Sequence, residues 1–169
     1  MYYILFIGFI LLAAVFQLFW GNFPVLFLAF PLNVIFAILW IFLLWKLYKE
    51  GKTLKITRIL LSHRTSILSI ILFICGCLVI GLFPQLSDAE ADMREGFVAA
   101  LGCYNFMTSW IFIAVLFILL SNLAMITIHA FYHRKNAKKR FLLNHVGLWL
   151  ALFAGFLGSS DTQTLRIPL

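Results

Sequence analysis

The sequence predicts an all-α membrane protein, a polytopic bundle of about five transmembrane helices. Apolar and aromatic residues make up 64% of its 169 residues and charged residues 11%, whereas soluble domains average roughly 45–50% and 25%. The apolar residues form runs of about twenty, the length at which a helix crosses a hydrocarbon core of ~30 Å. Nearly all cations fall in short segments between these runs, which is the pattern of cytoplasmic loops.

The first two apolar runs predict a helical hairpin. Span one covers residues 2–20 and ends at Gly21-Asn22-Phe23-Pro24, a turn sequence that does not continue a helix. It lacks the basic start and the cleavage site of a signal peptide, so we expect it to be retained. Span two covers about residues 25–45, and we expect Pro31 to kink this helix rather than to break it.

The other three spans are separated by loops of opposite charge. They cover about residues 66–83, 107–132 and 141–159. The positive-inside rule places the basic loops in the cytoplasm, and with them the N-terminus, while the acidic loop and the C-terminus lie outside. The basic loops carry Lys46, Lys49, Lys52, Lys55, Arg58 and Arg64, then Arg134, Lys135, Lys138, Lys139 and Arg140, and the acidic loop carries Asp88, Glu90, Asp92 and Glu95.

The placement of charge also indicates which kind of partner the cations face. A net charge of +7 could suit a nucleic-acid binder, but cations held in short loops between apolar runs are expected to face lipid headgroups. We therefore expect a single domain, residues 1–169, with the lipid bilayer as its partner and no nucleic acid.

Span five contains small residues at every fourth position. Gly147, Ala151, Gly155 and Ser159 form one stripe on a helix, and we call these four residues the small-residue stripe. Such a stripe lets a second helix approach closely, within this chain or in a partner. The sequence therefore predicts a helix-packing face here.

Two histidines lie within predicted spans, which makes them candidate functional residues because imidazole is costly in a bilayer. His129 and His145 each lie five residues from a basic loop, or about 7–8 Å along a helix, so they share a depth. His145 is expected to face away from the small-residue stripe, toward Trp149 and Leu152. The pair could ligate haem iron, relay protons or hydrogen-bond across helices, and the residues alone leave these alternatives open.

Further polar residues accompany these histidines. Asn122 and His129 are seven residues apart and share a face of span four. His63 and His133 adjoin the basic loops and are expected to be solvated. Asp161 is expected to cap a short helix or to pair with Arg166.

Several kinds of chemistry have no recognisable residues in this sequence. It contains no Ser-His-Asp set, no HExxH, no phosphate-binding glycine loop and no CxxC among Cys75, Cys77 and Cys103. No catalytic residue is therefore assigned. A solute transporter is disfavoured because the spans contain no Asp, Glu, Lys or Arg to mark a path.

The segment Phe141-Leu142-Leu143-Asn144-His145-Val146-Gly147-Leu148-Trp149 carries a family resemblance, continued by Ala154-Gly155-Phe156-Leu157-Gly158-Ser159-Ser160-Asp161 and Leu165-Arg166. It resembles the ResB (CcsB) proteins of cytochrome c biogenesis, in the form found in Bacteroidetes-type bacteria. The resemblance is strongest over residues 134–169. ResB proteins usually continue into a large extracytoplasmic domain, so the resemblance covers their N-terminal membrane part.

The resemblance implies a multi-pass subunit of a bacterial inner membrane that handles or exports haem with a CcsA-type partner and presents it to apocytochrome c. It implies that His145 is an axial ligand of the iron of haem b, with the second ligand supplied by the partner. His129 is an alternative second ligand by depth alone, which the family does not establish. The other function class that the sequence leaves open is a cofactor-free structural or assembly subunit of a membrane complex.

Overall fold

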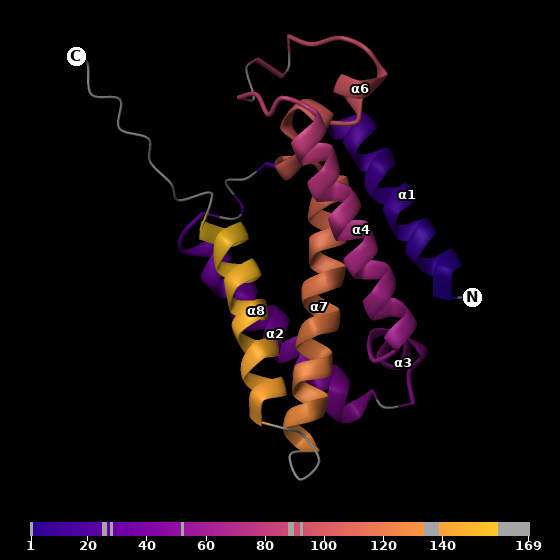
Figure 1. Cartoon of the computed structure of the whole chain (residues 1–169), viewed down its shortest axis with the longest axis vertical. Helices are drawn as coiled ribbons and strands as arrows, with labels where there is room; N and C mark the ends of the chain where they lie inside the picture. The colour runs from indigo at the N-terminus through magenta and orange to yellow at the C-terminus, as the bar shows by residue number, and fades with distance from the viewer. Residues whose placement is uncertain are drawn as a thin grey trace, which may run out of the picture.

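The computed structural model consists of helices that run in alternating directions around α7 (Figure 1). It describes residues 2–24, 27, 29–51, 53–87, 90–91, 93–133 and 139–158. This part of the chain contains no strand, so the all-α prediction is confirmed. The helices are α1 (Tyr2–Trp20), α2 (Leu32–Glu50), α3 (Lys55–Leu60), α4 (His63–Leu82), α6 (Phe97–Ala100), the 3-10 helix η2 (Cys103–Thr108), α7 (Trp110–Tyr132) and α8 (Lys139–Gly158).

Membrane-spanning potential is strongest in three of these helices. Helices α2, α4 and α7 are each long and apolar enough to cross a membrane. Helix α1 contributes a shorter apolar stretch, Ile4–Trp20. The exposed outer surface carries many large apolar side chains, an arrangement that suits a bundle whose solvent is lipid.

The start of α2 differs from its prediction. The helix begins at Leu32, directly after Pro31, so the expected kink inside the span is wrong. Proline is tolerated before the first turn because the N–H that it lacks would have no intrahelical acceptor there. Helix α7 also begins later than predicted, at Trp110 instead of about residue 107. Ser109 caps the helix there by accepting a hydrogen bond from Phe112 N (3.1 Å).

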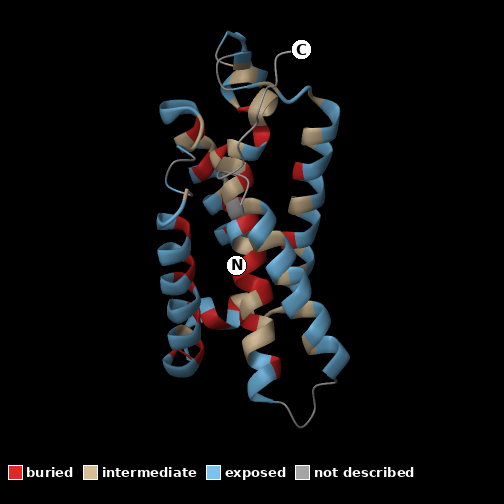
Figure 2. Cartoon of the chain, turned by 90° about the vertical axis from the view of Figure 1, so that its left-hand side faces the viewer, coloured by how far each residue is buried: buried red, intermediate tan, exposed pale blue. Residues whose placement is uncertain are grey.

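Helix α7 forms the centre of the molecule. It packs against α1, α2, α3, α4 and α8. Met125 is fully buried, and Leu116 and Leu120 are nearly so. Figure 2 shows that buried residues gather on the inward faces, while the outer faces are exposed. The core is therefore a seam along α7 to which each neighbouring helix adds one face.

Charge separates between the two ends of the bundle. The end of α2, helix α3, the start of α4, the end of α7 and the start of α8 lie at the lower end in Figure 1, and α6 and η2 lie at the upper end. The described cations of the lower end are Lys46, Lys49, Lys55, Arg58, Arg64, Lys139 and Arg140. At the upper end the described charged residues of the loop are Glu90, Arg94 and Glu95.

Candidate functional site

His145 lies in the second turn of α8, on the face that packs toward α7. That face continues through Trp149, whose Nε1 donates to Leu120 O (3.0 Å), and through Leu152, which packs against the central core. His145 is half-buried. Its predicted direction, with Trp149 and Leu152 and away from the glycines, agrees with this arrangement.

The hydrogen bond of His145 defines which ring nitrogen is available. His145 Nδ1 lies 2.9 Å from Phe141 O. A carbonyl oxygen only accepts, so Nδ1 of the neutral ring must carry the proton and Nε2 keeps its lone pair. This is the tautomer in which histidines commonly ligate metals, with the other nitrogen held by a second group.

His129 has different neighbours. Its Nδ1 lies 3.1 Å from Tyr48 Oη on α2, and its ring centroid is 4.3 Å from that of His133. His133 Nδ1 in turn donates to His129 O (3.0 Å). Within the described chain no contact joins His129 to His145, so the geometry does not bring the two predicted ligands together.

The described residues of the small-residue stripe face outward. Gly147, Ala151 and Gly155 are exposed, and a Cβ added at Gly147 or Gly155 would meet no atom within 4 Å. Ser159 lies outside the described residues. The sequence analysis expected a close-packed second helix on this stripe, either within this chain or in a partner. The described part of this chain does not supply that helix.

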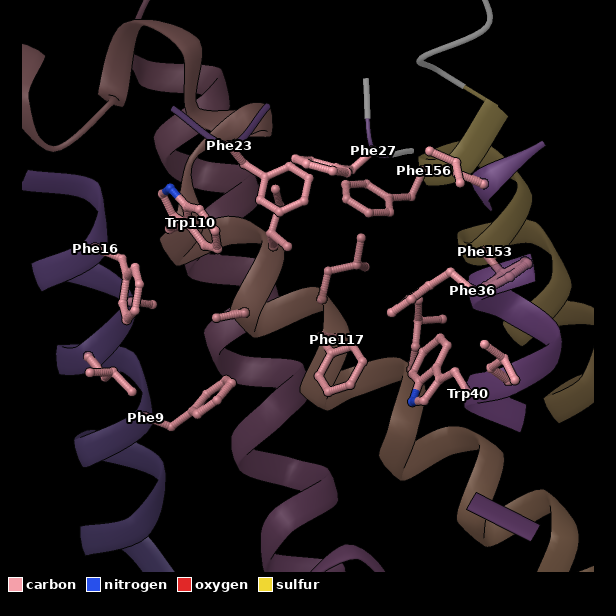
Figure 3. Close-up of a pocket in the computed structure, with 18 of the residues that line it drawn as sticks. Phe9, Phe16, Phe23, Phe27, Phe36, Trp40, Trp110, Phe117, Phe153 and Phe156 are labelled. Carbon is pink, nitrogen blue, oxygen red and sulfur yellow. The ribbon is translucent and has the colours of Figure 1, made fainter. Parts of the chain in front are cut away.

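Aromatic side chains line a cavity of about 620 Å³ between α1, α2, α7 and α8 (Figure 3). Phe9 and Phe16 come from α1, Phe36 and Trp40 from α2, and Phe153 from α8. None of the described residues that line it is a histidine, a cysteine or a charged residue. The cavity therefore offers no axial ligand to iron, and it is separate from His145.

A polar cleft of about 360 Å³ at the upper end was missed by the sequence analysis. Gln17 organises it: its Nε2 donates to Asn22 Oδ1 (2.8 Å) and its Oε1 accepts from Trp110 N (2.9 Å). These bonds tie the end of α1 to the start of α7. The signal that could have revealed it is one amide in an apolar run, four residues before a Gly-Asn turn. The left-handed glycines Gly21, Gly96 and Gly102 all line this cleft.

Asn122 belongs to a third polar region, between α4 and α7. Ser66 Oγ donates to Asn122 Oδ1 (2.9 Å), and Asn122 is buried. The predicted polar face of span four is thus shared between two partners, because Asn122 bonds to α4 whereas His129 bonds to α2. A buried amide between helices fixes their register.

Among the described residues, these sites offer hydrogen bonds and imidazole nitrogens rather than a catalytic set. No group of three or more His, Cys, Asp or Glu side chains that could hold a metal ion occurs among the described residues. Any iron at His145 would need its other ligand from outside this set.

Comparison with known proteins adds no relative. No protein-family model, no curated protein and no solved structure matches the chain. The ResB resemblance stays a prediction that rests on the residues of α8 and the segment after it.

Proposed function

We propose that this chain is a multi-pass protein of a bacterial inner membrane, with five spans, a cytoplasmic N-terminus and an outer C-terminus. Three helices have the length and apolar character to span a bilayer. The helices α1, α2, α4, α7 and α8 run in alternating directions, so the ends of α2 and α7 and the starts of α4 and α8 lie at one end of the bundle (Figure 1), together with the described cations of the lower end. The positive-inside rule assigns that end to the cytoplasm.

Within that membrane, the chain handles haem for cytochrome c maturation as a ResB-like subunit with a CcsA-type partner. The observation that supports this function best is the free Nε2 of His145, held in the ligand tautomer by Phe141 O. It belongs to the same segment of α8 that carries the family resemblance. Bound haem would supply the group whose covalent attachment to apocytochrome c completes the cytochrome.

The residues around His145 fit a shared haem site. His145 is half-buried rather than enclosed, and His129 is bonded to α2 instead, so a second axial ligand is assigned to the partner chain. Lys139 and Arg140 lie on the preceding turns of α8. Their charges would attract the carboxylates of a haem edge toward this end of the bundle.

The test is His145→Gly, expressed with the partner and compared with His63→Gly. The loss of an axial ligand should remove most of the bound haem or shift its absorption spectrum, and cytochrome c maturation should fall. Added imidazole should restore part of the spectrum because it can occupy the vacated axial position. His63 is exposed at the start of α4, so its loss should change neither haem content nor spectrum.

Two further outcomes decide between versions of the proposal. Retention of haem by His129→Gly would agree with a ligand from the partner, and its loss would favour a pair within this chain. If His145→Gly keeps the wild-type haem content, spectrum and maturation, the haem function is wrong.

A second function is favoured by the exposed, described residues of the small-residue stripe: a cofactor-free structural or assembly subunit of a membrane complex. The open space over Gly147 and Gly155 suits a close-packed partner helix. Absence of a haem spectrum in the purified complex, together with stable co-purification of a partner, would support this function instead.

A further inference from the structure

The last turns of α2 and α7 meet in a network of aromatic and polar side chains at the basic end of the bundle. Trp45 Nε1 donates to Tyr132 Oη (2.9 Å). Lys49 Nζ lies 4.3 Å from the centroid of the Trp45 ring, within the range of a cation–π contact. One indole therefore holds a hydroxyl at its edge and an ammonium over its face.

The direction of the hydrogen bond determines what the hydroxyl can do next. An indole N–H only donates, so Tyr132 Oη is the acceptor and its own proton remains available for another acceptor. The Tyr132 ring is fixed by stacking on Tyr48, with centroids 5.3 Å apart. Tyr48 is buried and its hydroxyl contacts His129. The position of the Tyr132 hydroxyl is thus set by packed residues.

The charge of Lys49 is not neutralised within the described chain. Its contact is the neutral Trp45 ring, and the carboxylate of the adjacent Glu50 instead lies 4.0 Å from Lys46 Nζ. Trp45 and Tyr132 remain 37% and 47% exposed. An ammonium and a hydroxyl proton are therefore both open to an anion from outside the bundle.

The surroundings of this pair are apolar on the side toward the membrane centre. Phe42, one turn earlier on α2, is exposed and contacts the Trp45 ring at a centroid distance of 5.9 Å. Phe131 on α7 is also exposed. An anion at Lys49 and Tyr132 would thus have exposed hydrocarbon surface directly beside it, which suits a ligand with a charged head and apolar chains.

The geometry points to a binding site for the phosphate of an anionic phospholipid, formed by Lys49 and Tyr132 on the platform of Trp45. A phosphate oxygen accepts both the ammonium and the hydroxyl proton, and charge-assisted bonds of this kind are stronger than neutral ones. Basic sites between helices at the membrane interface are known to take such headgroups. This site is separate from His145 and does not depend on haem.

The test uses the purified full chain in nanodiscs of phosphatidylcholine with a small fraction of phosphatidylglycerol. Native mass spectrometry measures how much phosphatidylglycerol is retained. Lys49→Gln and Tyr132→Phe should each lower its retention, roughly fivefold for the lysine, which matches one cation near an anionic surface. Both variants should melt close to wild type because the altered groups are exposed.

Lys46→Gln is the matched control. It removes the same charge from the same helix, but from a lysine that lies beside Glu50, so retention should stay near wild type. Equal losses in Lys46→Gln and Lys49→Gln, or no loss in Lys49→Gln and Tyr132→Phe, would overturn the site. Release of the lipid by millimolar inorganic phosphate would assign the site to free phosphate rather than to a phospholipid.

Discussion

Residue 102 has a backbone that strongly favours glycine. Gly102 has a φ of +72°, and a Cβ there would lie 2.7 Å from Gln17 Nε2 and 3.1 Å from Asn22 Oδ1. Gly102→Ala should therefore lower the free energy of unfolding by about 1–3 kcal/mol, through the strained backbone and the displaced Gln17 amide. Thermal unfolding of the purified protein in detergent measures this loss.

Gly81→Ala provides the comparison at the same scale. Gly81 is helical, and a Cβ there would meet no atom within 4 Å. Its replacement should leave stability unchanged or raise it by up to about 1 kcal/mol, since alanine favours the helix. If the two variants melted together, the close contact between Gly102 and Gln17 would not exist in the folded protein.

Individual residues were predictable where helical periodicity alone decides their direction. The side of α8 that His145 shares with Trp149 follows from a turn of ~100° per residue, and the structure agrees. The partners of Gln17 and Asn122 could not be predicted. Gln17 bonds to a residue 93 positions away, and Asn122 bonds to one 56 positions away. Periodicity within one helix does not specify which helix lies opposite.

Helix α8 has two faces with separate expected roles. Gly155 lies on the open face, so Gly155→Leu should leave the melting temperature of the isolated chain unchanged and disrupt its association with a partner. Leu152 packs against the core, so Leu152→Ala should cost about 1–2 kcal/mol of stability, less than a fully buried leucine. Co-purification with the proposed partner and thermal unfolding measure the two effects.

The two substitutions should therefore affect different properties: Gly155→Leu the association with a partner, and Leu152→Ala the stability of the chain. Loss of stability in the isolated chain from Gly155→Leu would mean that the small-residue stripe packs inside the molecule. Unchanged co-purification of Gly155→Leu would mean that no partner helix uses that face.

Elements were predicted well where apolar runs are long and poorly where the chain turns. The extents of α4, α7 and α8 agree with their predicted spans to within a few residues. The short helices α3 and α6 and the 3-10 helix η2 were not predicted, because segments of four to six residues have no full hydrophobic period. The predicted kink at Pro31 was wrong because a proline at a helix start and one inside a membrane helix look alike in sequence.

For the whole molecule, the orientation in the membrane is the prediction to test. In a cysteine-free background, Met93→Cys should react with an impermeant maleimide in intact cells, because its loop is predicted to lie outside and Met93 is 81% exposed. Lys55→Cys, exposed at the basic end, should react only after the membrane is opened. The reverse pattern would invert the topology.

The native Cys103 is a weaker reporter of the same topology. It is only partly exposed, and burial raises the pKa of its thiol. The thiolate is the reacting form, so at neutral pH Cys103 should be labelled more slowly than Met93→Cys, with the rate rising as pH approaches its pKa. Slow labelling of Cys103 alone is therefore no sign of an internal location.

The central position of α7 has a consequence for the order of events during synthesis. The extensive contacts among the long helices all include α7, yet α1, α2 and α4 leave the ribosome before it does. At about 5–20 residues per second, α1 waits on the order of ten seconds for the helix that receives it. During that time the amide of Gln17 lacks Trp110 as its partner, so a membrane insertase that shelters early helices would be most needed by α1.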